Sequence, residues 1–424
     1  MLLKIAIRNV FRHRRRTILT VLVMSVGVVF FIFFDSLFIG IDKMLIEELL
    51  KYQDGAIVIY SKEYAQNKKA YPLDKPIKNP QKIVNLVKSF KDIEVTFRTN
   101  FLAELIYFEK SKYIVATAID PTTDTKVFNL HNKIKEGRFL IDDNQYEILL
   151  GKKLADEFGV KVGDTVILSA YTKYNTYNAL EFVVCGLLET PVPTINESSV
   201  FLTLKCAEEL LTLDGSVTSA HIKVPWKKGE KIATYTKKVL YIVERLKKEL
   251  YSEYEIYSFR ELYNDFIVLM DQKKLSSFII VFFLLLISAV GIANTILMAV
   301  YERIKEIGVL MAFGFKPKQI RKLFLLEGVV MGVIGGFLGC VLAVGLNFWL
   351  VYSGWNLEAL YAEETTGLKA SQLGVPVWGR FYGEWNIYAY LFCFCFCILV
   401  AVFSSYFPAR YASKLQVRDC LKFV

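Results

Sequence analysis

Residues 278–300 read FIIVFFLLLISAVGIANTILMAV and contain no charged side chain. A helix of this length is long enough to cross the hydrocarbon core of a bilayer, which is roughly 30 Å thick. A helix in a soluble core is seldom apolar on every face over such a length. This stretch therefore predicts a transmembrane helix, and with it a membrane protein.

Three further stretches satisfy the same length rule. Residues 17–34 are uncharged, and apolar character continues past Asp35 to residue 41. The stretch 323–351 is interrupted only by Glu327. Both carboxylates lie near predicted span ends, where a water-facing acid costs little, so we expect a structural role for each. The sequence predicts four transmembrane helices, at 17–41, 278–300, 323–351 and 387–407, with one before and three after a polar domain at 42–277.

Basic residues are concentrated in the short segments between the predicted spans. Six lie in 1–16, six in 301–322 and four in the tail 408–424, whereas the loop 352–386 has two against four glutamates. The positive-inside rule therefore places both termini and 301–322 in the cytoplasm. The net charge of +10 thus comes from the segments predicted to face the cytoplasm and indicates the membrane topology. Because the domain 42–277 is close to neutral, we expect no nucleic-acid binding.

The first segment, 1–16, is expected to be a cytoplasmic amphipathic segment. Its basic start and the apolar run after it resemble a secretory signal, but the run is long and no small-x-small cleavage site follows. We expect an uncleaved anchor whose helix continues from Asp42 to Lys51 as a stalk.

The domain 42–277 has the alternating patterns of a mixed α/β extracytoplasmic domain. Strands are expected at 56–60, 101–108, 113–119, 146–150, 166–169, 181–187, 200–204, 219–224 and 254–258. Helices are expected at 80–90, 152–158, 205–213 and 228–250. Strand–helix–strand patterns at both ends predict two subdomains, one discontinuous (50–135 plus 217–262) and one β-rich insert (136–216).

No residue set for catalysis, cofactor binding or metal binding is evident. The chain has no phosphate-binding G-x-x-x-x-G-K-[ST] loop, and its three histidines are far apart. Cys393, Cys395 and Cys397 point in different directions on a helix and cannot form one ligand cluster. A disulfide between Cys185 and Cys206 remains open, because both lie in the outer domain.

The third predicted span carries glycines at four-residue spacing, the pattern that allows helix backbones to approach closely. They are Gly328, Gly332, Gly335, Gly336 and Gly339. Generic packing within one chain explains such a pattern, so it supports a helix bundle without identifying a partner.

The connection 301–322 begins YERIKEIG at 301–308 and continues VLMAFGFKPKQI at 309–320. Charge lies at the exit of the second span, a short apolar helix ends at a glycine, and a basic turn starts the next helix. Such a helix could fit a groove in a partner protein, and the alternative is a solvated interfacial loop.

This connection resembles the E-R-x-x-E-I-G-x-[LM]-x-A-x-G segment of ABC-transporter permeases of the MacB/FtsX/Lol type. Other segments match that family in the same order: AIRN at 6–9 with RRT at 15–17, LA at 154–155 with GVKVGD at 159–164, and FPARYA at 407–412. The matches extend over nearly the whole chain and agree with the predicted order of spans.

The resemblance implies a permease subunit that is not itself an enzyme. In this family two copies of a separate cytoplasmic ATPase bind ATP and Mg, and their motion is transmitted to the outer domains of a permease dimer, whose second subunit is the same or homologous. The implied ATPase-coupling residues are Glu302, Arg303, Glu306, Gly308 and Gly314. FtsX-like members carry much smaller outer domains, which leaves lipoprotein release and MacB-like export. Because no fused ATPase is present, the resemblance favours extraction of lipoproteins from the inner membrane and their transfer to a periplasmic carrier. MacB-like export and FtsX-like signalling without transport are the alternatives, and the expected location is the bacterial inner membrane.

Two further sets of residues are candidates for contact with a substrate or a partner. An apolar substrate between the first and second spans would be lined by Phe30, Phe31, Phe34, Phe38, Phe266, Met270 and Phe278, although contact with membrane lipid explains these side chains equally well. The tip 171–178 is rich in tyrosine, and Tyr171, Tyr174 and Tyr177 are candidates for binding the periplasmic partner. The proline-rich turn 190–194 is the next candidate, and an ordinary solvated loop is the alternative for the tip.

Overall fold

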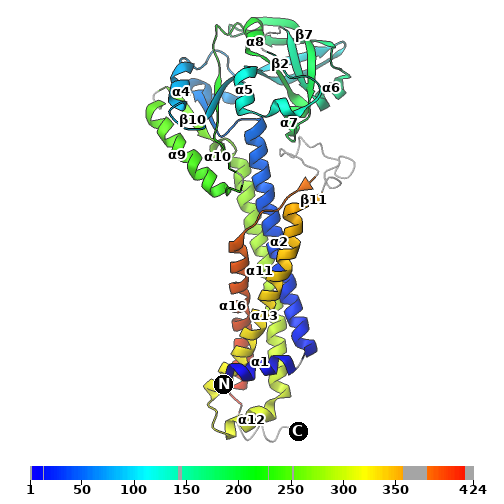
Figure 1. Ribbon diagram of the computed structural model, residues 1–424, viewed down its shortest axis with the longest axis vertical. Coiled ribbons are helices and arrows are strands. Elements are labelled where there is room, and N and C mark those ends of the chain that lie inside the picture. The colour runs from blue at the N-terminus through cyan, green and yellow to red at the C-terminus, as the bar shows by residue number, and fades with distance from the viewer. Residues whose placement is uncertain are drawn as a thin grey trace. The chain divides into compact units, whose positions relative to one another are not determined.

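The computed structural model describes residues 2–12, 14–141, 146–227, 229–250, 253–356 and 380–415. Most of the predicted loop 352–386 and the end of the predicted tail 408–424 lie outside the described residues. The chain forms two compact units, which are treated separately below (Figure 1). The helical unit comprises residues 1–42, 268–356 and 380–424, and the outer unit is formed by Lys43–Ile267.

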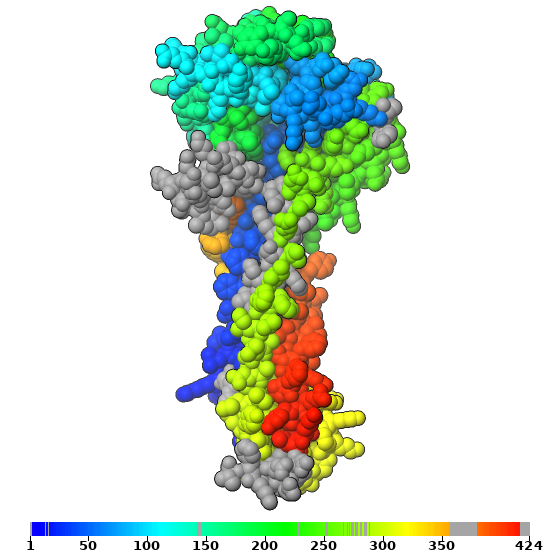
Figure 2. Space-filling view, turned by 180° about the vertical axis from the view of Figure 1, so that it is seen from behind, coloured from blue at the N-terminus to red at the C-terminus, as the bar shows by residue number. Residues whose placement is uncertain are grey.

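Long helices dominate the helical unit. They are α1 (Leu2–Arg12), α2 (Arg14–Tyr52), α11 (Asn264–Glu302), α12 (Ile304–Ala312), α13 (Pro317–Tyr352) and α16 (Ile387–Ala412), together with a short pair of strands, β11 (Trp355–Asn356) and β12 (Arg380–Phe381). Both α2 and α11 continue into the outer unit. The rings of Tyr301 and Tyr411, near the ends of α11 and α16, lie 5.7 Å apart, and the two helices run beside each other in the space-filling view (Figure 2).

Among the residues that the structure describes, three helices are long and apolar enough to cross a membrane: Thr17–Tyr52, Pro317–Tyr352 and Ile387–Ala412. They correspond to the first, third and fourth predicted spans. The second predicted span lies within the continuous helix α11, in which the described apolar segment is the shorter stretch Ala289–Glu302. A transmembrane helix at 278–300, the second predicted span, therefore stays a prediction.

The glycines of α13 pack against two different helices. Gly332 faces α16, where a Cβ would lie 2.7 Å from the Cβ of Ala401. Gly339 faces α2, where a Cβ would lie 2.6 Å from the Cβ of Val28. Real Cβ atoms do not approach so closely, so glycine at these positions is what permits the helix separation. The stripe is thus explained by packing within one chain.

The outer unit is built on a single ten-stranded sheet. Its strands are β1 (Ile57–Ser61), β2 (Glu94–Tyr107), β3 (Lys110–Ile119), β4 (Ile134–Gly137), β5 (Glu147–Gly151), β6 (Thr165–Tyr171), β7 (Tyr177–Leu188), β8 (Ser199–Thr203), β9 (Ser219–Lys223) and β10 (Tyr254–Ser258). The hydrogen-bonded order is β10-β1-β9-β2-β3-β8-β5-β7-β4, and β6 pairs with both β2 and β7.

Because β6 joins β2 to β7, the strands β2, β3, β8, β5, β7 and β6 close into a ring. Alternate residues of each strand point inward, and a ring this small is filled by side chains. Its core is a contiguous buried cluster that includes Phe101, Leu105, Ile114, Leu150, Leu168, Phe182, Val200 and Leu202. The ring is therefore a packed barrel.

The long strand β2 belongs to both halves of the sheet. Its first residues, Glu94–Arg98, pair with β9, and residues 98–107 pair with β3. The expected division into subdomains 50–135 plus 217–262 and 136–216 is not confirmed, because β2 and β3 complete a ring with strands of the insert. Local pattern does not reveal the pairing of β2 with β6, since Leu105 and its partner Leu168 are far apart in sequence.

Short helices connect the strands of the outer unit. They are α3 (Lys62–Gln66), α4 (Pro80–Val87), α5 (Pro121–Val127), α6 (Lys152–Phe158), α7 (Pro193–Ser198), α8 (Leu204–Leu211), α9 (Ile232–Leu250) and α10 (Phe259–Leu262), with 3-10 turns at Lys68–Ala70 and Leu130–Lys133. The segment expected to be a proline-rich turn at 190–194 instead leads into α7, whose first residue is Pro193. Proline suits that position because the first amide of a helix has no intrahelical acceptor.

Candidate functional site

A buried ion pair lies at one end of the helical unit. Glu327 of α13 is 2% exposed, and Nη1 of Arg303, which is 6% exposed, lies 3.0 Å from its Oε1. Nδ2 of Asn9 on α1 donates to the same carboxylate at 2.6 Å. The expectation that Glu327 faces water is therefore wrong. The carboxylate is buried because a guanidinium and an amide replace the hydrogen bonds of water.

Glu306 of α12 extends this pair toward the surface. Its carboxylate accepts a hydrogen bond from Nε of Arg303 at 2.8 Å and another from Nη1 of Arg12 at 2.7 Å. The hydrogen bond from Arg303 is the main reason that the pKa of Glu306 lies below its usual value. Glu306 therefore stays ionised at neutral pH, and the network joins α1, the end of α11, α12 and α13.

Of the five predicted coupling residues, two take part in the network and two are glycines, which lack a side chain that could join it. Arg303 and Glu306 belong to the network, whereas Glu302 is exposed at the end of α11. Gly308 is buried within α12, and Gly314, with φ of +90°, ends that helix in the left-handed conformation that glycine favours. Sequence reasoning missed Asn9 and Arg12 as members of the site, although both lie within or beside the quoted N-terminal motif.

The exposed side of α12 carries Lys305 and Val309, and Phe313 follows it. Phe313, directly after the helix, is 82% exposed, and Val309 is also exposed. Ile304 and Ile307 face the other way and are buried against the helical unit. A short helix that is fixed on one side by ion pairs and leaves Lys305, Val309 and the following Phe313 exposed has the geometry of a docking element.

The aromatic residues proposed to line a substrate path lie mostly on α2. The rings of Phe30 and Phe34 are 6.2 Å apart, and those of Phe34 and Phe38 are 6.0 Å apart, so they form a continuous stack. Phe31 contacts Phe392 of α16, at 6.0 Å between ring centroids. Met270 is buried, and the side chains of Phe266 and Phe278 lie outside the described residues. A lining role for this set stays a prediction.

The tyrosine-rich tip is a tight connection between β6 and β7. Tyr171, Tyr174 and Tyr177 are all exposed. The hydroxyl of Tyr174 donates to Asp214 at 2.8 Å, and that of Tyr177 donates to the hydroxyl of Ser169 at 2.7 Å. The rings are therefore held in place while their faces remain accessible, as binding surfaces require.

Within the outer unit, three donors hold the end of α2 and the two residues that follow it, and we call this set of contacts the clamp. The amide of Asn129 donates to the carbonyl of Lys51 at 3.0 Å, and Nη1 of Arg98 donates to the carbonyl of Gln53 at 3.0 Å. The Tyr263 hydroxyl, just before α11, donates to the carboxylate of Asp54. The first two contacts satisfy backbone carbonyls at a helix end, where intrahelical partners are lacking.

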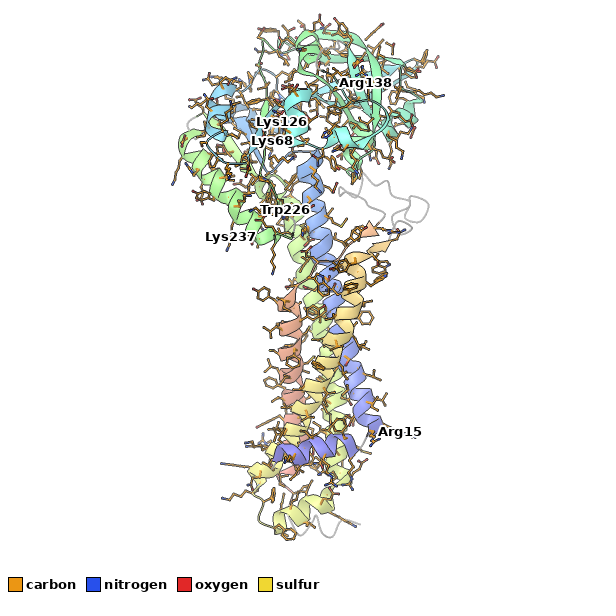
Figure 3. All side chains as sticks on the ribbon, in the orientation of Figure 1. Arg15, Lys68, Lys126, Arg138, Trp226 and Lys237 are labelled. Atoms are coloured by element: carbon orange, nitrogen blue, oxygen red, sulfur yellow. The ribbon has the colours of Figure 1, made fainter. Side chains whose placement is uncertain are left out.

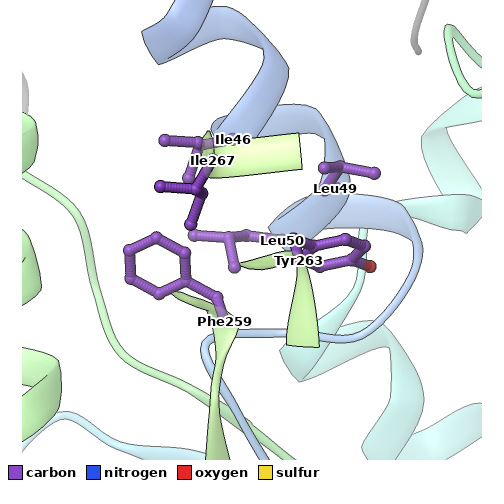
Figure 4. Close-up of a pocket in the computed structure, with 6 residues that line it drawn as sticks. All are labelled: Ile46, Leu49, Leu50, Phe259, Tyr263 and Ile267. Carbon is purple, nitrogen blue, oxygen red and sulfur yellow. The ribbon is translucent and has the colours of Figure 1, made fainter. Parts of the chain in front are cut away.

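Apolar packing beside this clamp joins α2 to α10 and to the start of α11. Ile46, Leu49 and Leu50 of α2 face Phe259, Tyr263 and Ile267 across a shallow groove (Figure 4). The clamp and the groove lie within the outer unit.

Arg98 itself belongs to a buried ion pair with Asp124 at the start of α5. Nε and Nη2 of Arg98 contact the two carboxylate oxygens at 2.7 and 3.1 Å, and the guanidinium lies 3.4 Å from the ring centroid of Phe128. His221 lies in the same cluster, between Ser219 and the carbonyl of Asp54. Burial lowers the pKa of His221 to about 4, so the ring is neutral at pH 7. Its Nδ1 then donates to Asp54, and Nε2 accepts from Ser219.

Cys185 and Cys206 are both buried free thiols. The Sγ of Cys206 accepts a hydrogen bond from the amide of Tyr146 at 3.2 Å, and Cys185 donates to the carbonyl of Ile148 at 3.4 Å. Each thiol is used locally, so the disulfide left open by the sequence does not form in this structure.

Long apolar helices, the short helix α12 tied to them by ion pairs, and a sheet domain inserted in the chain between the first two long helices are the architecture of a membrane protein with a large extramembrane domain. Two family models match the chain. The MacB-like periplasmic core domain matches residues 17–239, and the FtsX-like permease C-terminal domain matches residues 278–417. The chain belongs to the MacB/FtsX/Lol type of ABC transporter permease.

Similar proteins carry several different names. An uncharacterized ABC transporter permease of Methanocaldococcus jannaschii is 26% identical over 98% of this chain and 96% of its own length. The lipoprotein-releasing system transmembrane protein LolC of Neisseria meningitidis is 25% identical over 57% of this chain and 56% of its own. The macrolide export protein MacB of Haemophilus ducreyi is 30% identical over 34% of this chain and 17% of its own.

Proposed function

We propose that this permease transmits the ATP-driven motion of a separate cytoplasmic ATPase, which binds ATP and Mg, to its own outer unit. The proposal includes the topology in which both termini and α12 are cytoplasmic. Two copies of the ATPase would each dock on the α12 of one permease subunit. The second permease subunit would be another copy of this chain or a homologue.

The observation that carries this proposal is the network around Glu306. Glu306 accepts from Arg12 at 2.7 Å and from Arg303 at 2.8 Å, and Arg303 also pairs with the buried Glu327. A displacement of α12 therefore acts on α1 and α13 through charge-assisted hydrogen bonds, which are stronger than neutral ones. At the far end of α2, the clamp around Gln53 and Asp54 would pass motion to the sheet.

Charge reversal at Glu306 tests the coupling. Glu306→Arg places a third guanidinium beside Arg12 and Arg303 and removes contacts worth roughly 1.5–3 kcal/mol. We expect at least a ten-fold loss of ATPase stimulation or of ATPase binding to the purified permease, with its folded yield largely retained.

The matched control is Glu249→Arg, which makes the same change of charge at an exposed position of α9. It should leave both readouts unchanged. Normal assembly together with normal ATPase stimulation in Glu306→Arg would refute a coupling role for the network.

For the substrate, we propose lipoproteins that are extracted from the inner membrane and passed to a periplasmic carrier. The similarity to LolC supports this choice. The acyl chains would lie against the aromatic stack of Phe30, Phe34 and Phe38, which is partly exposed and apolar. Export of a periplasmic substrate is the second candidate, favoured by the match of 17–239 to the MacB-like core domain. Signalling to a periplasmic enzyme without transport is the third.

The tip between β6 and β7 is the proposed contact with the carrier. Tyr174→Ser with Tyr177→Ser removes two exposed rings without touching the barrel core. We expect binding of a purified lipoprotein carrier to weaken about ten-fold or more, since two aromatic contacts in an interface are lost, while ATPase stimulation stays normal. Unchanged carrier affinity in this double variant would show that the tip is an ordinary loop.

A further inference from the structure

Helix α1 lies across the end of the helical unit and is fixed there on one face (Figure 1). Ala6 and Val10 are buried, and the hydroxyl of Thr17 donates to the carbonyl of Val10 at 2.8 Å. Asn9 and Arg12 add the polar contacts to Glu327 and Glu306 described above. These contacts fix the orientation of α1. They also determine which side chains of α1 stay exposed.

The next face of α1 is apolar and uncovered. Leu3, Ile7 and Phe11, each four residues apart, are all exposed. With 3.6 residues per turn, this spacing places them in one stripe beside the face that Ala6 and Val10 bury. An uncovered apolar stripe on a helix at the end of a transmembrane bundle requires an apolar environment, and the bilayer is the one adjacent to the spans.

Basic side chains border the stripe. Lys4 and Arg8 are exposed on α1, and Arg14 and Arg15 are exposed at the start of α2, where Arg15 projects from the helix (Figure 3). None of these four has a carboxylate partner among the residues that the structure describes. Arg12, in contrast, pairs with Glu306 at 2.7 Å. Unpaired cations flanking an apolar stripe are complementary to a leaflet that carries negative headgroups.

We infer that α1 is a membrane-surface helix that binds anionic phospholipid, and that Arg12 links this binding to the position of α12. Leu3, Ile7 and Phe11 insert among the acyl chains, and Lys4, Arg8, Arg14 and Arg15 hold the phosphates. A phosphate near Arg8 competes with Glu306 for Arg12. Lipid occupancy then shifts the network around Glu306 and with it α12. The lipid-binding part stands without the proposed function, and the link to coupling rests on it.

The lipid-binding part is tested on the full chain alone. The purified permease is exchanged between nanodiscs of phosphatidylcholine with and without phosphatidylglycerol, and the retained lipid is counted by native mass spectrometry after mild delipidation. We expect phosphatidylglycerol to be retained over phosphatidylcholine. Each basic residue near an anionic surface contributes roughly five-fold, so Lys4→Gln with Arg8→Gln should lower this preference more than ten-fold.

Two controls separate lipid binding at α1 from general charge effects and from other occupants. Lys237→Gln with Lys248→Gln removes the same charge from exposed positions of α9 and should change nothing. A diazirine side chain at position 7 or 11 should crosslink to lipid, and one at position 237 should not. Equal retention of the two lipids, equal retention in the Lys4/Arg8 variant and the wild type, or crosslinks from positions 7 and 11 to protein instead of lipid would each overturn the inference.

The link to coupling has its own readout in the complex with the ATPase. ATPase stimulation by the permease should change several-fold with phosphatidylglycerol in the wild type but not in Lys4→Gln with Arg8→Gln. A normal lipid preference with lipid-independent stimulation would refute the link through Arg12 while leaving lipid binding intact. Failure of the permease to stimulate the ATPase in any lipid would instead refute the proposed function.

Discussion

Replacing Asp124 with alanine is expected to lower the free energy of unfolding of the outer unit by about 3–5 kcal/mol. Arg98 would keep its buried position, against the ring of Phe128 and the carbonyl of Gln53, but would lose both oxygens of the Asp124 carboxylate that pairs with it. A buried guanidinium without a counter-charge costs several kcal/mol. Because Arg98 also caps the end of α2, the loss should loosen the connection between that helix and the sheet.

Unfolding of the full chain can be followed through Trp226, which stacks on Tyr235 within the outer unit at 4.2 Å. Asp156→Ala is the matched control, because Asp156 pairs with Lys152 at an exposed site and should cost at most about 1 kcal/mol. The double variant Arg98→Met with Asp124→Leu removes both charges and should recover much of the stability. Equal stability of Asp124→Ala and Asp156→Ala would show that the buried pair contributes nothing.

Local pattern was sufficient to predict most elements of the outer unit. The strand at 254–258 and the helix at 152–158 coincide with β10 and α6, because alternation and helical spacing are properties of a few consecutive residues. The strands flanking the tip were predicted too short, since Tyr171 and Tyr177 look like loop residues but pair across β6 and β7. Tertiary pairing thus extended strands that local composition would have ended.

Closure of the barrel could not be predicted from local pattern. It depends on β2 pairing with β6, in which Ala103 lies opposite Ala170, and no turn links these strands directly. Each strand taken alone is compatible with an open sheet. The predicted division into two subdomains was therefore based on the order of strands and helices along the chain. The pairing partner of a strand is a property of the whole fold, and a single sequence carries little information about it.

The motif singled out the segment 301–314 as a candidate for coupling, but it did not predict the network around Glu306. Arg303 and Glu306 stand three residues apart, whereas Asn9 and Glu327 are separated by most of the chain and meet only in three dimensions. Glu327 was expected to face water because it lies near the start of a predicted span. Hydropathy along the chain predicts how deep in the membrane a charged residue lies. It does not show that Arg303 and Asn9 supply the hydrogen bonds that allow Glu327 to be buried.

Glu327→Ala is expected to destabilise the helical unit by about 3–5 kcal/mol and to abolish coupling. The substitution leaves Arg303 buried with the surface carboxylate of Glu306 as its one remaining carboxylate partner among the described residues, and it removes the acceptor of Asn9. Both α1 and α12 would lose their shared anchor on α13. We expect a lower thermal midpoint in detergent and a loss of ATPase stimulation that exceeds the loss of folded protein.

A double variant separates folding from transmission. Arg303→Met with Glu327→Met replaces the buried ion pair with apolar side chains, a change that is often neutral for stability or stabilising. It should therefore restore the thermal midpoint but not ATPase stimulation, because α12 no longer has a charged link to α13. Glu249→Ala, at an exposed site on α9, should leave both readouts unchanged. If the double variant restores stimulation together with stability, the pair serves packing alone, and transmission must run through other contacts of α12.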